Sequence, residues 1–161
     1  MAAVTLVGIG EMAISSTAGE ILSAPNLGSC VGVAVYDPIH AIGGMIHCLL
    51  PLSKSNPEKA ATQPTTFVDT GVVLLFKEML ARGSEKKNLV IAVAGGSNIN
   101  DTNNVFEIGK KNYTVLRKVL WQNSLLIKGE HVGSSVSRTI SLHIGVGEIW
   151  VKVQGEQIRL A

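Results

Sequence analysis

Apolar residues alternate with small or polar ones over several short segments of the chain, a period that is typical of β-strands. This pattern predicts strands at residues 4–7, 20–24, 31–36, 41–50, 89–94, 125–127, 139–144 and 149–153. We expect Gly145-Val146-Gly147 to join the last two of these strands as a hairpin.

Two longer segments carry apolar residues every three or four positions, which is the period of an amphipathic helix. The first covers residues 66–82, where Thr66 and Asp69 suit a helix start and Gly83 suits its end. The second covers residues 108–123. Polar loops are expected at residues 53–63 and from residue 97 to residue 104. Strands at both ends with two main helices between them predict a single-domain α/β fold, a layered mixed sheet over residues 1–161.

Composition narrows the class of protein. Hydrophobic residues are 46% of the chain and charged residues 16%, so the chain can fill a core and disorder is not expected. A net charge of +2 argues against a nucleic-acid or membrane-surface protein. No apolar run approaches the ~18 residues of a membrane span, and no basic region precedes the first apolar segment as it would in a signal peptide. We therefore expect a cytoplasmic protein.

Two cysteines and four scattered histidines limit the possible chemistry. Two cysteines are too few for a disulfide scaffold, and the histidines show no zinc-binding spacing. Gly95-Gly96-Ser97-Asn98 follows a strand but lacks the Lys and Ser/Thr of a phosphate-binding loop. We expect neither a metal nor a cofactor.

One cysteine and one histidine are spaced symmetrically about a turn. Asp37-Pro38 is a turn signal, and a turn at residues 37–40 would pair residues whose numbers sum to 77. Cys30 would then lie opposite His47, with Cβ atoms about 4.5–5.5 Å apart. A slip of one residue would place them on opposite faces, and both could instead be core residues.

A neighbouring imidazolium would lower the pKa of a thiol and favour the nucleophilic thiolate. Such a thiolate can attack a carbonyl carbon, while the imidazolium protonates the leaving group. Gly28 and Ser29 would leave backbone N–H groups free as oxyanion donors. Cys48 follows His47 directly, so it should point to the opposite face and serve in packing.

The same stretch, with others along the chain, resembles the CheD family of chemoreceptor glutamine deamidases. The matching motifs are Leu27-Gly28-Ser29-Cys30-Val31, Asp37-Pro38, Gly44-Met45-Ile46-His47, Leu50-Pro51, Val68-Asp69-Thr70, Ala94-Gly95-Gly96, Ile108-Gly109-Lys110-Lys111-Asn112, Gly133 and Ser137-Arg138. Their order and spacing fit the family over nearly the whole chain.

The resemblance implies a cytoplasmic enzyme of bacterial or archaeal chemotaxis that hydrolyses receptor glutamines to glutamate and releases ammonia. It implies Cys30 as the nucleophile and His47 as the general base and acid, working through a thioester. It also implies the fold of deamidating toxins of the cytotoxic necrotising factor type. CheC-type phosphatases are implied as partners, so an adaptor that binds receptor or phosphatase without turnover is the alternative function.

The chain departs from the family pattern just before Cys30, where the family has a Thr that orients the catalytic His. Here residues 22–26 read Leu-Ser-Ala-Pro-Asn. Ser23 fits the position if the loop carries an extra residue, and we take it as the third catalytic residue. Asn26 could instead orient the imidazole, as an Asn does in papain-like enzymes. The alternatives are an exposed hydroxyl at Ser23 and a turn former at Asn26.

Overall fold

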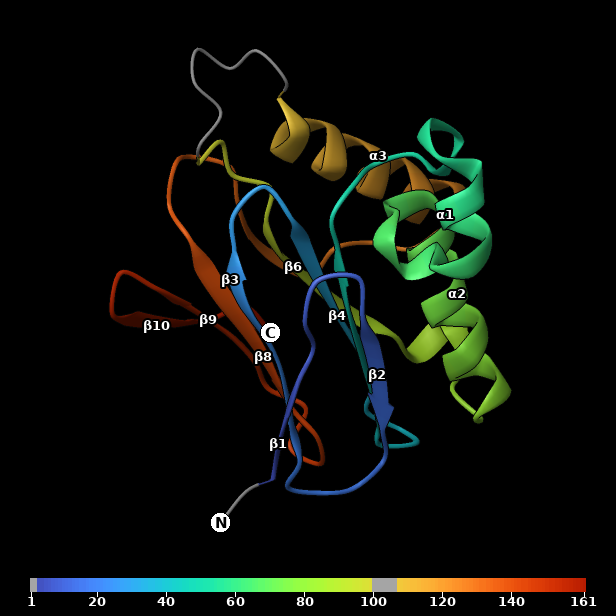
Figure 1. Ribbon diagram of the computed structural model, residues 1–161. Helices are drawn as coiled ribbons and strands as arrows, with labels where there is room; N and C mark the ends of the chain where they lie inside the picture. Colours follow the sequence, from blue (N-terminus) through green and yellow to red (C-terminus); the bar gives the residue numbers. More distant parts are fainter. Residues whose placement is uncertain (1–2, 100–106) are drawn as a thin grey trace.

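A computed structural model describes residues 3–99 and 107–161, and these form three layers (Figure 1). Two β-sheets pack face to face, and the helices cover the outer face of one of them. The α/β class and the two main helices expected from the sequence are confirmed, but the strands divide between two sheets.

The first sheet, which has no helix against it, runs in the order β1-β3-β8-β9-β10. Its only parallel pair among the described strands is β1 with β3. The bounds are Val4–Leu6 for β1, Ile21–Leu27 for β3, Arg138–His143 for β8, Ile149–Val153 for β9 and Glu156–Arg159 for β10.

The second sheet runs in the order β2-β5-β4-β6-β7 and lies between the first sheet and the helices. Its bounds are Met12–Ser15 for β2, Val31–Asp37 for β4, Ile42–Cys48 for β5, Val90–Gly95 for β6 and Gly129–Val132 for β7. The central strands β4 and β5 are buried at every residue, because they are covered on both faces.

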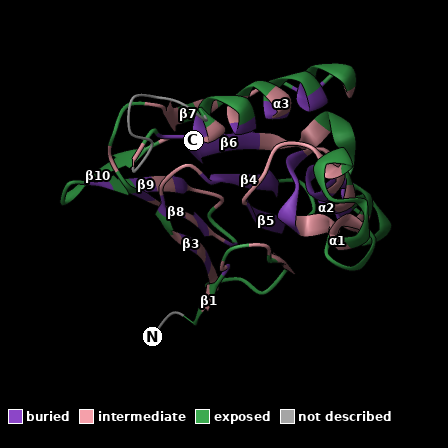
Figure 2. Ribbon diagram, turned by 45° about the horizontal axis from the view of Figure 1, so that its top comes forward, coloured by how far each residue is buried: buried purple, intermediate pink, exposed green. Residues whose placement is uncertain are grey.

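The helices are α1, Pro57–Thr62, α2, Val68–Ala81, and α3, Ile108–Gln122. Short 3-10 turns occur at Ser53–Ser55, Pro64–Thr66 and Lys86–Asn88. The inner faces of α2 and α3 are buried against the second sheet while their outer faces are exposed (Figure 2). The residue before α2, Phe67, makes no side-chain capping hydrogen bond. The carboxylate of Asp69, in the first turn, accepts hydrogen bonds from the N–H and the hydroxyl of Ser53.

Alternate residues of β4 and β5 supply two separate hydrophobic clusters. Val31, Val33 and Val35 pack toward α2 and α3, whereas Ala34 and Tyr36 pack toward the first sheet. The period of two along a strand thus assigns every side chain of the hairpin to one of two cores. Whatever chemistry the hairpin carries must lie at its ends, where the cores meet solvent.

Most predicted elements are confirmed within a few residues, and the differences have local causes. Residues 125–127 are not a strand, because Ser124 turns the chain in a left-handed conformation and Leu125 N–H bonds back to Leu120. The strands β2, β7 and β10 were not predicted, and α1 forms inside the expected 53–63 loop. Residues 100–104 of the second expected loop lie outside the described residues.

Candidate active site

The turn of the β4–β5 hairpin lies one residue later than the sequence predicts, which shifts the pairing of the two strands by two residues. Asp37 pairs with Ile42 across a turn of residues 38–41, so paired residues sum to 79 and not to 77. The Asp37 carboxylate accepts hydrogen bonds from the N–H groups of Ile39 and His40, and Ala41 takes a left-handed conformation at φ 55°. His47 therefore pairs with Gly32, and the prediction that it lies directly opposite Cys30 is wrong.

A shift of two residues leaves the face of each side chain unchanged. Cys30 lies directly before β4 and packs in the core between the sheets. Met45 and, by alternation, His47 point to the same face. The two residues are thus diagonal neighbours on one face. Cys48 is fully buried among the side chains that face the helices, so its predicted packing role on the opposite face is confirmed.

The segment that leads into Cys30 is held by hydrogen bonds to three successive backbone carbonyls, those of Gly28, Ser29 and Cys30. Ser97 N–H donates to Gly28 O at 2.9 Å and Gly96 N–H donates to Cys30 O at 2.8 Å. Between them, Ser29 O accepts from the side-chain amide of Asn112 at 2.9 Å. Gly95 must be glycine, because a Cβ built there would lie 2.2 Å from Cys30 O.

The amide hydrogens of the same segment remain available. Within residues 3–99 and 107–161, no acceptor takes a hydrogen bond from the backbone N–H of Gly28 or Ser29. The N–H of Cys30 lowers the pKa of its own thiol, against the effect of burial. These N–H groups are therefore candidates for donors to an oxyanion formed beside Cys30.

The segment between β1 and β2 holds His47 by its backbone and by its ring. His47 N–H donates to Glu11 O at 3.0 Å, and Gly10 N–H donates to His47 O at 2.8 Å. The ring is 2% exposed, and its Nδ1 lies 3.0 Å from Val7 O, which fixes the tautomer with the proton on Nδ1. In the described part of the chain, Nε2 has no hydrogen-bond partner, so the expected thiol–imidazole hydrogen bond is not formed here.

Burial dominates the protonation of both groups. It raises the pKa of the Cys30 thiol, against the opposing effect of that residue's own N–H. It also lowers the pKa of His47, against the opposing effects of the Val7 carbonyl and of Glu11. The resting pair is therefore a neutral thiol and a neutral imidazole, and not the thiolate and imidazolium expected from the sequence.

Neither residue predicted to orient His47 reaches it. Ser23 alternates with Leu22 and Ala24, which fill the core between the sheets, so its side chain points to the outer face of the first sheet. Asn26 is exposed, at φ 55°, in a bulge where β3 gains one residue relative to β8. The orienting group on Nδ1 is instead the Val7 carbonyl, which no side-chain motif could reveal.

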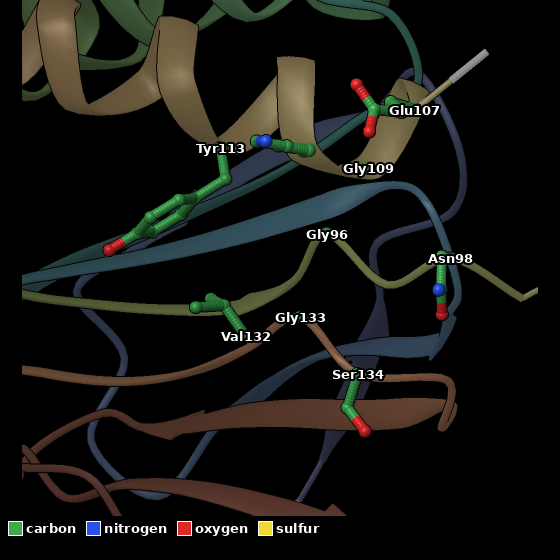
Figure 3. A pocket seen from close by; sticks show the side chains of 9 residues that line it. Gly96, Asn98, Glu107, Gly109, Tyr113, Val132, Gly133 and Ser134 are labelled. Carbon is green, nitrogen blue, oxygen red and sulfur yellow. The ribbon is translucent and has the colours of Figure 1, made fainter. Parts of the chain in front are cut away.

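A pocket of about 320 Å³ opens beside the Gly96 turn, whose N–H donates to the Cys30 carbonyl. Figure 3 shows its walls, with Gly96, Asn98, Gly133 and Ser134 below, Gly109 and Tyr113 on α3 above, and Glu107 just before α3. Neither Cys30 nor His47 lines it. Among the described residues, no group of three or more His, Cys, Asp or Glu side chains is placed to hold a metal ion.

Comparison with known proteins gives a consistent family assignment. Residues 49–153 match the model of the family described as CheD chemotactic sensory transduction. The "Probable chemoreceptor glutamine deamidase CheD 1" of Syntrophus aciditrophicus is 44% identical over 96% of this chain and 96% of its own length. The "Probable chemoreceptor glutamine deamidase CheD" of Solibacter usitatus is 40% identical, over 96% and 92%. The protein of that name from Thermococcus kodakarensis is 35% identical, over 89% and 88%.

A crystal structure titled Bacillus licheniformis hypothetical protein YfiH aligns with a TM-score of 0.46 and 14% identity, over 77% of this chain and 49% of that one. This likeness is too slight to bear on function. None of the helices among the described residues has the length and apolar character needed to span a membrane.

Proposed function

The chain belongs to the CheD family, and on that premise we propose that it hydrolyses glutamine side-chain amides of chemoreceptors to glutamate, with release of ammonia. The relatives' names support the deamidation of chemoreceptors. The residue roles given below, and a location in the cytoplasm, are parts of the proposal.

In the first half of the reaction, Cys30 Sγ bonds to the amide carbon of the glutamine as the thiol proton passes to His47 Nε2. The amide oxygen becomes an oxyanion beside the unpaired N–H groups of Gly28 and Ser29. The intermediate then collapses as the C–N bond breaks, and the imidazolium returns its proton to the departing nitrogen. Ammonia leaves, and a thioester to Cys30 remains.

In the second half, His47 removes a proton from water as the water oxygen bonds to the thioester carbon. Collapse breaks the C–S bond, frees the glutamate side chain and returns the proton to the sulfur. The balance is one water consumed and one ammonia released, with no cofactor required.

One observation carries this mechanism: His47 is held at Nδ1, has no partner at Nε2 among the described residues, and lies on the face of the second sheet that also bears Cys30. A buried polar atom without a partner is costly, so such atoms are few in folded proteins. A neutral imidazole with a free Nε2 lone pair is the form that a general base requires. The carbonyl of Val7 replaces the orienting side chain of a triad, so we propose a Cys–His pair and not a triad with Ser23.

The test is mass spectrometry of a chemoreceptor cytoplasmic fragment from the same genome, incubated with the purified chain. Conversion of specific glutamines to glutamates is expected with the wild type and with Cys48→Ala, and not with Cys30→Ala. Receptor that stays fully amidated under all three proteins would overturn the proposed activity.

The resemblance also supports a CheC-type phosphatase as a partner, which we propose as a second property of the chain. Co-elution of a phosphatase of that type with Cys30→Ala tests binding apart from turnover. If the wild type binds the phosphatase or receptor but never deamidates the receptor, the chain is an adaptor, and the enzymatic proposal is wrong.

A further inference from the structure

A single buried amide links the segments that carry the two proposed catalytic residues. Asn112, on α3, is 0% exposed, and its Nδ2 donates to Ser29 O at 2.9 Å and to Leu49 O at 3.0 Å. Ser29 directly precedes Cys30, and Leu49 lies two residues after His47. Both amide hydrogens are thus used on carbonyls that flank the pair.

The bond to Ser29 O also fixes a group on the neighbouring residue. A trans peptide unit is planar, so its C=O and N–H point in opposite directions. The carbonyl of Ser29 and the N–H of Cys30 belong to one such unit. When Asn112 holds that carbonyl on the α3 side, the N–H of Cys30 points away from α3, toward the side on which the Cys30 side chain packs between the sheets.

We propose that Asn112 is a positioning residue for the nucleophile: by holding the Ser29 carbonyl it orients the Cys30 N–H onto the sulfur, where it stabilises the developing thiolate. The inference rests on the proposed function for its role in catalysis, but its geometry concerns Cys30 alone. Hydrogen bonds in a chain polarise one another, so a donor on the carbonyl also strengthens the N–H of the same peptide unit.

Close packing at the start of α3 brings Asn112 within reach of the loop. A Cβ on Gly109 would lie 2.1 Å from Ser97 O, so only glycine allows the helix to approach the Gly96–Ser97 backbone so closely. Figure 3 shows Gly109 above Gly96 at this contact. Asn112 is three residues further along α3, on the same face of the helix, and therefore reaches Ser29.

The hydrogen bonds of the Asn112 side chain are all donated by its Nδ2 group. Its Oδ1 has no hydrogen-bond partner among the described residues, whereas both Nδ2 hydrogens are used. Burial of an unpaired oxygen is unfavourable, so the contribution of this amide comes from the two hydrogen bonds that its Nδ2 donates. A variant that removes the donor therefore tests the role of the residue directly.

The ionisable groups near Cys30 come from three neighbouring elements. His47 and Cys48 lie on β5, and Arg138 on β8 donates to Gly95 O beside the Cys30 carbonyl. Glu11, which acts on His47, precedes β2. A neutral substitution at Asn112 changes none of these charges, so it isolates the effect of the hydrogen bond.

The experiment measures the rate of alkylation of Cys30 by iodoacetamide against pH, in the full chain, with the labelled peptide quantified by mass spectrometry. Asn112→Ala and Asn112→Leu both remove the donor, and Leu keeps the branched shape of the side chain if Ala fails to fold. Because the thiolate is the reactive form, the pH midpoint of Cys30 alkylation should rise by about half to one pH unit in both variants. Their alkylation rate at neutral pH should fall about three- to tenfold.

Asn123→Ala is the matched control, because the Asn123 amide also donates to a backbone carbonyl, Val119 O at 2.8 Å, at the other end of α3. Its alkylation midpoint should equal that of the wild type. A wild-type midpoint in a folded Asn112→Ala or Asn112→Leu would overturn the inference, as would an equal shift in Asn123→Ala. Receptor deamidation by the wild type is measured beside it: if that is absent while the Asn112 shift is present, the proposed function fails and the positioning role stands.

Discussion

The two ends of the β4–β5 hairpin bury polar side chains in opposite ways. At the turn, Asp37 is 0% exposed and its carboxylate is fully engaged by the N–H groups of Ile39, His40 and Glu85 and by the His40 ring. At the open end, His47 is 2% exposed and one of its two ring nitrogens has no partner among the described residues. Both side chains are buried, but among the described residues only Asp37 has hydrogen-bond partners for all of its polar atoms.

The contrast separates a stabilising site from a reactive one. A buried charge surrounded by donors stabilises the fold when its pKa is lower in the folded than in the unfolded state, as it is for Asp37. A buried group left half-paired contributes less to stability but retains a lone pair for chemistry. Breaking the open end should therefore reduce activity, and breaking the turn end should reduce stability.

The largest effect is expected from Cys30→Ala, which should lower receptor deamidation by about 10³-fold or more, since the nucleophile itself is removed. Cys48→Ala should stay active and lose roughly 1 kcal/mol of unfolding free energy, because it leaves a small cavity under the helices. Deamidation by mass spectrometry and urea unfolding measure the two losses. Comparable activity in both variants would contradict a catalytic role for Cys30 and a packing role for Cys48.

His47→Ala should lower deamidation by about 10²-fold or more, as expected for loss of a general base. The pH profile sharpens this test. Burial lowers the pKa of His47 below its ordinary value of 6.5, and the base works only when neutral. Wild-type kcat/KM should therefore stay high as pH falls to 6.5 and decline only below it. A decline that begins well above pH 7 would contradict a buried neutral base.

At the turn end, Asp37→Ala should cost about 2 kcal/mol of stability and leave deamidation unchanged, because it strands buried N–H groups. Burial raises the pKa of this carboxyl, but the N–H groups of Glu85, His40 and Ile39 and the His40 ring outweigh it and bring the pKa to about 2. A folded pKa below the unfolded value of 3.8 gives stability that is complete above about pH 4. It is lost as pH falls toward 2.

Urea unfolding at pH 7 and at pH 2.5 checks this pH dependence. The difference in stability between wild type and Asp37→Ala should shrink at the lower pH. His40→Ala serves as the control, since it removes one half-exposed partner and should cost less than Asp37→Ala. An equal loss at both pH values would mean that the carboxylate is not the stabilising form.

The smallest effects are expected from the two residues that the sequence suggested as partners of His47. Ser23→Ala should keep turnover close to wild type and change stability by only about 0.5 kcal/mol, because the side chain points away from the core. Asn26→Gly should also be near neutral, since Gly tolerates the left-handed conformation found there. A large fall in kcat for either variant, with the fold intact, would support a catalytic triad in which that residue is the third member.

Sequence patterns predicted the α/β class, both main helices and the strands of the hairpin, because apolar periodicity reports directly on which side chains are buried. The same patterns missed β2, β7 and β10, which are edge strands with few fully buried residues. Asn112 was part of a motif that matched the family, but no pattern of residues indicated that its amide bonds to Ser29 and Leu49.

The sequence by itself determined which face Cys30, His47 and Cys48 occupy. Side chains alternate along a strand, so an error of two residues in the register changed the distance but not the face. Only the tertiary structure decided what holds the imidazole. The partner is the backbone carbonyl of Val7. Because every residue has a carbonyl, the residue type at position 7 gives no sign of this role. The position of that carbonyl depends on how the segment after β1 crosses the end of β5.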